Sequence, residues 1–377
     1  MRQWDAGKKQ GGTLQGGFLD FFRSWDPLTH FELFSFCFML KPWAVPYKLL
    51  TFFCLPVTLV QNMGNETTST KYKILKILRD SNGPLSGENA AKALGISRTS
   101  VWKAVQSLQD AGYGIESTAS GYMLAQDLDD SIFPCEFGEE EKYFTYFKST
   151  ESTMIQARKI AQGKHSVSGE PEFRIVTADE QTKGRGKGNR VWKTTKGSLA
   201  FTLVTSDQKP HFLSERMVMA SQIALCESLR RISDKKFFLR WPNDVWTEDG
   251  KVAGILDELF STGSMCSWQN LGIGINIHSA PHIEKTDRVL DNSKPGIRRE
   301  ILRNFCMNFS RLKKTALSED DSLSRLWNSL CMDYQKEVKT KKNGTFVFAG
   351  INAYGCGILK SEHGCKILVP GSDSYVK

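Results

Sequence analysis

The stretch Gln181-Thr-Lys-Gly-Arg-Gly-Lys-Gly-Asn-Arg-Val-Trp192 alternates three glycines, Gly184, Gly186 and Gly188, with cations. Glycine accepts positive φ and leaves the neighbouring N–H groups uncovered. Exposed amides together with cations form a nest for a phosphoryl or other anionic group. The preceding residues 173–179 have the pattern of a strand, so the loop leaves a sheet. Taken alone, such a run is more often a solvated turn or a nucleic-acid contact than a phosphate site.

Two further motifs narrow the interpretation. Arg240-Trp-Pro-Asn-Asp244 follows about fifty residues later, and Lys251-Val-Ala-Gly-Ile-Leu256 begins seven residues after Asp244. In this order and spacing, the three motifs strongly resemble those of biotin protein ligases. The resemblance extends from residue 72 to the C-terminus and implies an α+β protein. Its central mixed-sheet ligase domain, of the class II synthetase-like biotin ligase type, is expected to form biotinyl-AMP and to pass biotin to a lysine of a carrier protein.

The chemistry of adenylation indicates which side chains matter. When the biotin carboxylate attacks the α-phosphorus of ATP, negative charge develops on the phosphoryl oxygens and must be met by positioned cations and amides. The resemblance implies three catalytic residues, namely Lys251, Arg185 and Asp244. It implies a biotin site made of Ser152, Thr153, Met154, Gln181, Arg185, Gly186, Lys187 and Lys251. It implies an ATP site made of Gly184, Lys187, Trp192, Asn243 and Asn276.

Each of these residue types also has an ordinary structural role. A lysine at the start of a strand is usually solvated, and a tryptophan such as Trp192 often belongs to a core. Asn243 follows a proline in a turn where Asx side chains commonly serve only the backbone. The chain also departs from the family pattern, with Met154, Lys187 and Asn189 in place of asparagine, arginine and glycine. The lysine keeps the charge and loses the bidentate fork of arginine.

A DNA-binding domain is expected at residues 63–128. Apolar residues at helical spacing predict a helix from residue 70, and Ser86 and Ser97 are suited to cap two more around Gly95-Ile96. Residues 113–124 then have the pattern of a two-stranded wing, and this order is typical of a winged helix-turn-helix. Repressor-type biotin ligases carry such a domain in this position; a helical docking module that never meets DNA is the alternative. The candidate DNA-binding residues are Gly87, Ser97, Arg98, Thr99, Ser100, Trp102, Lys103 and Gln106.

Residues 1–62 receive no fold assignment. Their longest apolar run, Leu49–Val60, is shorter than the roughly 20 residues that cross a bilayer, and a signal peptide fits poorly. A polar leader that runs directly into a helix begins at Met63, and we favour Met63 as the start of the protein over a membrane anchor in residues 1–62. Nine cysteines without a C-x-x-C pair favour a reduced, cytoplasmic protein over a disulfide framework or a metal site.

The rest of the chain divides into two further domains. Residues 126–138 indicate a linker, residues 138–332 alternate strands and helices as the ligase domain, and residues 333–377 alternate as a small SH3-like β-barrel. Within the ligase domain, one strand is expected at Phe237–Thr247.

The net charge of +9 suits a nucleic-acid partner. We therefore expect a biotin–[biotin carboxyl-carrier protein] ligase that also acts as a biotin-responsive transcriptional repressor. The expected partners are the carrier protein, operator DNA and, with adenylate bound, a second copy of the chain; no membrane partner is expected. Mg²⁺ would accompany the ATP phosphates without a protein metal site. A DNA-binding biotin sensor without transferase activity is the alternative, and a lipoate ligase of related fold is disfavoured by the winged helix and the Arg240–Asp244 motif.

Overall fold

The computed structural model describes residues 69–163, 173–188, 190–206, 208–318, 320–340, 344–370 and 375–376. The predictions for residues 1–62 and for a start at Met63 lie outside this part of the chain. Within it, no helix combines the length and the apolar character that a bilayer crossing requires.

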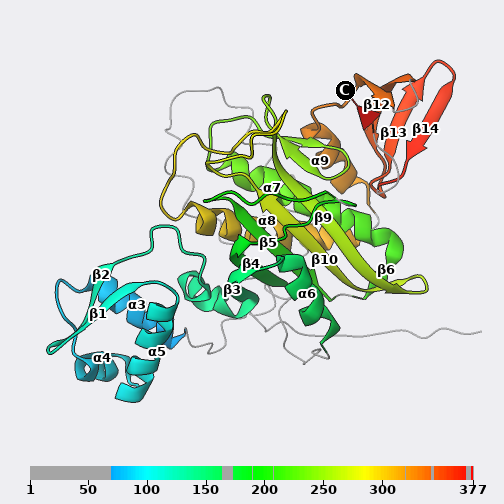
Figure 1. Cartoon of the computed structure of the whole chain (residues 1–377). Coiled ribbons are helices and arrows are strands. Elements are labelled where there is room, and N and C mark those ends of the chain that lie inside the picture. Colours follow the sequence, from blue (N-terminus) through cyan, green and yellow to red (C-terminus); the bar gives the residue numbers. More distant parts are fainter. Residues whose placement is uncertain are drawn as a thin grey trace, which may run out of the picture. The chain divides into compact units, whose positions relative to one another are not determined.

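The N-terminal part of the described chain is a winged helix-turn-helix (Figure 1). The hydroxyl of Ser86 accepts the Asn89 N–H at 3.0 Å and that of Ser97 accepts the Ser100 N–H at 3.1 Å, so both predicted caps form. Gly95, with φ of 64°, ends the second helix in the left-handed conformation. The elements are α3 (Thr70–Asp80), α4 (Gly87–Leu94), α5 (Arg98–Asp110), β1 (Gly114–Thr118) and β2 (Gly121–Gln126).

The central domain, which the sequence predicts as the ligase domain and which keeps that label below, is built on one eight-stranded mixed sheet. Its path is β3-β4-β5-β10-β9-β8-β7, with β6 beside β10; β3 and β4 are parallel and the other pairs are antiparallel. The strands are β3 (Phe144–Thr150), β4 (Arg174–Gln181), β5 (Leu199–Thr205), β6 (Lys209–Pro210), β7 (Phe238–Arg240), β8 (Asp244–Trp246), β9 (Lys251–Thr262) and β10 (Met265–Ile275).

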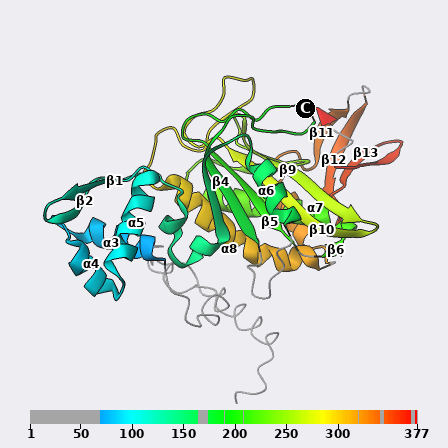
Figure 2. The same ribbon diagram turned by 60° about the horizontal axis from the view of Figure 1, so that its bottom comes forward.

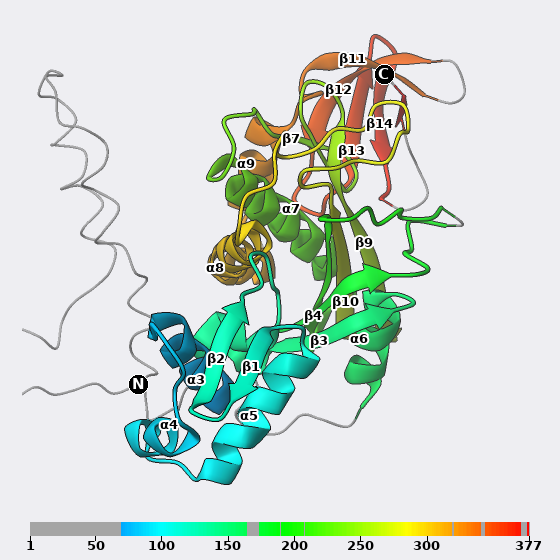
Figure 3. The same ribbon diagram turned by 60° about the vertical axis from the view of Figure 1, so that its left-hand side comes forward.

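Helices cover the two faces of this sheet (Figures 2 and 3). Because side chains alternate along a strand, Ile175 of β4 joins the large core under α7 and α8, while the next residue, Val176, packs under α6. The cavity described below lies on the α6 face. The helical segments are η2 (Pro134–Tyr143), α6 (Thr153–Gln162), η3 (His211–Leu213), α7 (Ser214–Arg230), α8 (Ile297–Leu317) and α9 (Ser322–Leu330).

The C-terminal domain is a five-stranded antiparallel sheet in the order β14-β13-β12-β11-β15. The sequence predicted a small SH3-like β-barrel here; the structure confirms a β domain, as one antiparallel sheet, and its closure as an SH3-like barrel stays a prediction. Trp241 of the ligase domain donates its Nε1–H to the Gly355 carbonyl at 3.0 Å and stacks on Tyr375, so this domain contributes to one wall of the cavity. The strands are β11 (Lys336–Thr340), β12 (Thr345–Ile351), β13 (Gly357–Ser361), β14 (Gly364–Leu368) and β15 (Tyr375–Val376).

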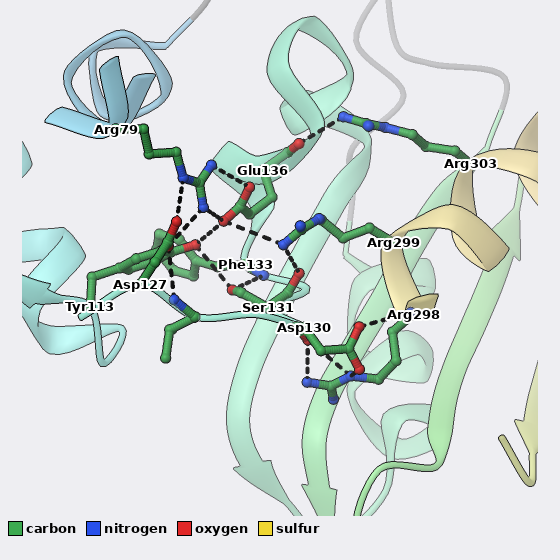
Figure 4. A network of polar contacts seen from close by, with 11 residues as sticks. Arg79, Tyr113, Asp127, Asp130, Ser131, Phe133, Glu136, Arg298, Arg299 and Arg303 are labelled. Carbon is green, nitrogen blue, oxygen red and sulfur yellow. Dashed lines mark hydrogen bonds and ion pairs between the residues drawn. The ribbon is translucent and has the colours of Figure 1, made fainter. Parts of the chain in front are cut away.

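The segment that the sequence indicates as a linker is packed between the helix-turn-helix and the ligase domain (Figure 4). Glu136, only 6% exposed, receives a bidentate contact from Arg79 of α3 at 3.0 and 2.7 Å and a hydrogen bond from the Tyr113 hydroxyl. From α8, Arg299 pairs with the same carboxylate at 3.5 Å, and Arg303 donates to the Glu136 carbonyl at 2.7 Å. Cys135 belongs to the helix-turn-helix core and Phe137 to the ligase core.

One predicted strand is wrong. Instead of a single strand at Phe237–Thr247, the chain forms two short antiparallel strands, β7 and β8, that pair with one another across a turn at residues 241–243. The Trp241–Pro242 peptide bond in this turn is cis. Proline has no N–H to donate to a strand ladder, which is the physical reason for the break.

Candidate active site

The glycine-rich loop after β4 folds back on itself as a narrow hairpin. The Gly186 N–H donates to the Arg190 carbonyl at 2.8 Å, and the Trp192 N–H donates to the Gly184 carbonyl at 3.0 Å. A Cβ at Gly184 would lie 2.3 Å from the Trp192 carbonyl oxygen, so this close pairing requires glycine there. The hairpin leaves the Arg185 side chain exposed and turns Trp192 toward the sheet.

A cavity of about 600 Å³ opens beside this hairpin, on the α6 face of the sheet. All three sequence motifs line it, because the end of β4, the β7–β8 turn and the start of β9 meet there. Of the predicted ligand-binding residues, Gly184 alone does not line the cavity; it packs against Trp192 within the hairpin. The others that line it are Ser152, Thr153, Met154, Gln181, Arg185, Gly186, Lys187, Trp192, Asn243, Asp244, Lys251 and Asn276.

Lys251 and Asp244 form an ion pair at the wall of the cavity. The Lys251 Nζ lies 2.6 Å from Asp244 Oδ1 and 5.9 Å from the centroid of the Trp192 ring. The register of β8 on β9 explains the pair, since Asp244 is opposite Gly254 and a Cβ at Gly254 would lie 2.9 Å from the ammonium. A cation held by one carboxylate, against an aromatic face and beside a cavity, can meet negative charge on a ligand.

The N-terminus of α6 supplies a second polar wall. Thr153 donates its N–H and its hydroxyl to Gln181 Oε1, at 2.9 and 3.1 Å, and accepts the Thr202 hydroxyl at 2.8 Å. Ser152, fully buried, caps the helix by accepting the Met154 N–H at 3.3 Å. Ser152 is therefore engaged as the helix cap, and Thr153 and Gln181 are fixed as one unit.

Two predicted ATP-site residues keep a buried polar atom without a hydrogen-bond partner among the described residues, namely Trp192 through Nε1 and Asn276 through Oδ1. Buried polar atoms are nearly always paired, so these two atoms mark places where a ligand's donor or acceptor fits. Asn276 Nδ2 is engaged with the Asp287 carbonyl at 3.1 Å. Asn243 serves its own turn, since its side chain donates to the Ile255 carbonyl and its carbonyl accepts the Ile255 N–H at 2.9 Å.

Sequence reasoning missed the glycines that form the floor of the cavity. A Cβ at Gly272 would lie 2.6 Å from the Met154 sulfur, and one at Gly274 would lie 2.3 Å from the Trp192 ring. Met154, at the family's asparagine position, therefore packs flat on β10 and brings an apolar thioether to the cavity. The alternation in Gly272-Ile-Gly-Ile275, with glycine on one face and isoleucine on the other, is the sequence signal that could have predicted this floor.

The candidate DNA-binding residues lie apart from this cavity in sequence and cluster at the start of α5. Arg98, Thr99, Lys103 and Gln106 are exposed, and Trp102 is 53% exposed. Ser97 and Ser100 are engaged in capping α5, as the hydrogen bonds above show. Gly87 begins α4 and faces the Tyr122 ring of the wing, since a Cβ there would lie 3.5 Å from it.

Among the described residues, no group of three or more His, Cys, Asp or Glu side chains is arranged to hold a metal ion. The expectation that Mg²⁺ travels on the ATP phosphates remains a prediction.

Comparison with known proteins agrees with this geometry. Residues 146–276 match the model of the biotin/lipoate A/B protein ligase family, and residues 70–123 match a helix-turn-helix domain. Over residues 146–276 the chain is similar to the biotin/lipoate A/B protein ligase family. The matched span runs from β3 to the residue after β10, and so it contains the three motifs and most of the cavity wall.

Three relatives illustrate the likeness. The bifunctional ligase/repressor BirA of Bacillus subtilis is 25% identical over 306 residues, which span 75% of this chain and 91% of that protein. The biotin–[acetyl-CoA-carboxylase] ligase of Paracoccus denitrificans is 35% identical over 134 residues, 35% of this chain and 53% of that protein. A solved biotin protein ligase of Aquifex aeolicus, in complex with biotin and ATP, matches with a TM-score of 0.51 and 25% identity, covering 63% of this chain and 99% of that one.

Proposed function

We propose that this chain joins biotin to ATP as biotinyl-AMP, transfers the biotinyl group to a lysine of a carrier protein, and represses transcription in response to biotin. The Lys251–Asp244 ion pair carries the proposal, because it sets a positioned cation against an aromatic face in a cavity with a glycine- and cation-rich rim. The family and the relatives named above support the same activity.

The first step joins two anions. A carboxylate oxygen of biotin forms a bond to the α-phosphorus, the bond to the bridging oxygen breaks, and pyrophosphate leaves. Lys251 is placed to neutralise the charge that develops on the phosphoryl oxygens, and Asp244 orients its ammonium. Arg185 and Lys187 of the hairpin add cations at the rim, and Mg²⁺ on the phosphates supplies further charge neutralisation.

The second step transfers the acyl group. The amine of the carrier lysine attacks the biotinyl carbonyl carbon, AMP leaves, and the amine loses a proton. Asp244 accepts a hydrogen bond from Lys251 on one oxygen, Oδ1, which leaves Oδ2 as an acceptor for an incoming ammonium. The face of the Trp192 ring is available for adenine to stack on. Its Nε1–H has no hydrogen-bond partner among the described residues and is available as a donor to the ligand.

The regulatory half rests on the winged helix-turn-helix and its exposed helix α5. Two such helices reach two half-sites when two copies of the chain associate, and we infer that the adenylate-loaded protein forms that dimer. A reduced, cytoplasmic setting fits the operator and carrier partners; this location remains a prediction.

One experiment separates the candidate functions. The protein is incubated with ATP, Mg²⁺ and a biotin carboxyl carrier domain, with labelled biotin in one arm and labelled lipoate in the other. Label on the carrier lysine in the biotin arm alone is the expected result. Label from lipoate would favour the lipoate ligase, and biotin binding without any transfer would favour the DNA-binding sensor.

A further inference from the structure

A partly buried carboxylate, that of Asp287, lies just outside the cavity and joins three separate segments of the ligase domain. Asp287, with a side chain 13% exposed, accepts the Thr247 hydroxyl at 2.6 Å. Both of its oxygens lie 3.3 Å from the Nζ of Lys235, which comes from the segment between α7 and β7. Burial acts to raise the pKa of Asp287, but hydrogen bonds from Thr247, the Arg288 main chain and Lys235 outweigh it and hold the pKa below its usual range. None of Asp287, Thr247 and Lys235 lines the cavity.

The main chain around Asp287 holds two of the candidate site residues. The Lys251 N–H donates to the Lys285 carbonyl at 2.9 Å, and the Asp287 N–H donates to the Lys251 carbonyl at 3.0 Å. Asn276 Nδ2 donates to the Asp287 carbonyl at 3.1 Å. Residues 285–287 therefore bracket the backbone of Lys251 on both sides and fix the Asn276 amide.

The turn that precedes Lys251 packs tightly on this segment. A Cβ at Gly250 would lie 2.7 Å from the Lys285 carbonyl carbon, so the two backbones are in direct contact. The Thr247 hydroxyl closes the turn by accepting the Gly250 N–H at 3.3 Å, and it donates to Asp287. This hydroxyl is thus a link between the Asp287 carboxylate and the turn that leads into Lys251.

We propose that Asp287 is a positioning residue for adenylation, which acts through Thr247 and through its own main chain to fix where the Lys251 ammonium lies beside the cavity. The role rests on the proposed function, because it concerns the cation that meets the phosphoryl charge. A displacement of this cation by about 1 Å costs on the order of 100-fold in rate when catalysis depends on placement.

The test compares four single variants and one double variant. Asp287→Ala removes the carboxylate, Thr247→Val removes the hydroxyl at nearly constant shape, and Thr247→Ser restores it; the double variant combines the first two. Asp291→Asn is the matched control, because Asp291 also pairs with Lys235, at 3.6 Å, but its side chain is 65% exposed, far more than that of Asp287.

The first readout is biotin-dependent exchange of labelled pyrophosphate into ATP. We expect Asp287→Ala and Thr247→Val each to lower kcat on the order of 10- to 100-fold, with a smaller change in the KM for biotin, because the position of Lys251 changes while the biotin walls do not. The double variant should be no slower than the slower single variant, since both act through one link. Thr247→Ser and Asp291→Asn should retain normal exchange.

The second readout needs no substrate. Amide hydrogen exchange at Lys251 and Asp287, whose N–H groups form the bracket, should be faster in Asp287→Ala and Thr247→Val and unchanged in Asp291→Asn. Normal protection of these amides in both variants, or normal kcat in folded variants of an active protein, overturns the inference. A wild-type protein without biotin-dependent exchange instead contradicts the proposed function, and the amide measurement then still decides whether Asp287 fixes Lys251.

Discussion

At the scale of single residues, the cavity depends on its charged side chains and on glycines, which have no side chain. Lys251 and Asp244 are 28% and 22% exposed, so water screens their ion pair only in part. We expect Lys251→Ala to lose on the order of 100-fold or more in adenylate formation, because a positioned cation is removed from the developing phosphoryl charge. Pyrophosphate exchange measures this loss.

The control for Lys251→Ala is Lys236→Ala. Lys236 also forms a lysine–carboxylate pair, with Glu248 at 3.8 Å, but these side chains are 76% and 70% exposed. Such an exposed pair is worth little, and exchange should stay normal. Near-normal exchange by folded Lys251→Ala would remove Lys251 from the catalytic residues.

Gly274 leaves room for the Trp192 ring because glycine has no Cβ. A methyl group at this position would lie 2.3 Å from the Trp192 ring, so Gly274→Ala must push the indole away from β10. If adenine stacks on this indole, ATP binding should weaken on the order of 10-fold, since stacking of a base on an aromatic ring is worth about 1–3 kcal/mol. The KM for ATP in pyrophosphate exchange reports the change. Gly83→Ala, where a Cβ meets nothing within 4 Å, is the control, and an unchanged KM for ATP would place adenine elsewhere.

The sequence predicted the polar residues of the cavity better than its shape. The three motifs are contiguous, so Arg185, Asp244 and Lys251 stand out without a structure. The contact of Gly274 with Trp192 joins residues more than eighty positions apart, and the contact of Asp287 with Thr247 joins residues forty positions apart. Both contacts depend on strand register and loop packing, which composition and periodicity do not determine.

At the scale of elements, α7 shows where periodicity is insufficient. Apolar residues recur along this helix at helical spacing, but its buried face also contains Arg216, which is 0% exposed. Arg216 donates to the carbonyls of residues 315, 316, 320 and 353 at 2.8 to 3.0 Å. The last carbonyls of a helix lack intrahelical partners, and here Arg216 satisfies two of them, at the end of α8.

Arg216→Met should therefore destabilise the ligase domain by about 3–5 kcal/mol, because it leaves several buried carbonyls unpaired. The free energy of unfolding in urea measures the effect. Arg311→Met is the control, since Arg311 is 57% exposed and its single pair with Glu227 should contribute about 0–1 kcal/mol. Equal stability of the two variants would show that Arg216 does not hold α7 to α8.

The first turn of α7 also predicts a pH dependence. Burial raises the pKa of Glu215 to about 7 from 4.5; the charge of Asp257 on β9 raises it further, and Lys187 opposes the shift. The folded state therefore binds a proton more tightly than the unfolded state, so the contribution of Glu215 to stability is present below pH 4.5 and is lost as the pH rises through about 7.

Glu215→Gln should remove this part of the pH dependence. The urea midpoint of the wild type should fall between pH 4.5 and 7 more steeply than that of the variant, while Glu248→Gln, in an exposed turn, should behave like the wild type. Identical profiles for Glu215→Gln and the wild type would contradict the raised pKa.

At the scale of the whole molecule, the winged helix-turn-helix contacts the ligase domain, and the buried carboxylate of Glu136 lies at the centre of one set of these contacts. Glu136 is contacted by Arg79 and Tyr113 on one side and by Arg299 on the other (Figure 4). It belongs to residues 126–138, whose five acidic or amide residues and Pro134 indicated a linker. The partners of Glu136 come from α3, from the segment after α5 and from α8. Because these segments are far apart in the sequence, no local sequence pattern predicts the contacts.

This arrangement is relevant to how biotin binding at the cavity would change the affinity of the winged helix-turn-helix for DNA. Arg298 of α8 pairs with Asp130 at 2.9 Å and with Asp179 at 3.1 Å, and Asp179 lies on β4 two residues before Gln181. Two separate sets of ion pairs, one around Glu136 and one around Arg298, thus meet at the neighbouring residues Arg298 and Arg299 of α8. If the adenylate-loaded protein forms the dimer proposed above, DNA binding should tighten when biotin and ATP are both present.

Arg98 and Lys103 provide the test of the DNA-binding half. Both are exposed on α5, so replacing both with alanine should weaken binding to DNA upstream of biotin synthesis or transport genes. The salt dependence of log K should flatten by about one unit of slope for each phosphate that the protein no longer neutralises. Biotin transfer to the carrier should be unchanged, because neither side chain lines the cavity. Mobility-shift titrations at several salt concentrations, with and without biotin plus ATP, measure both effects. If neither the wild type nor its loaded form binds such fragments above non-specific background, the winged helix has no operator and the chain is a ligase alone.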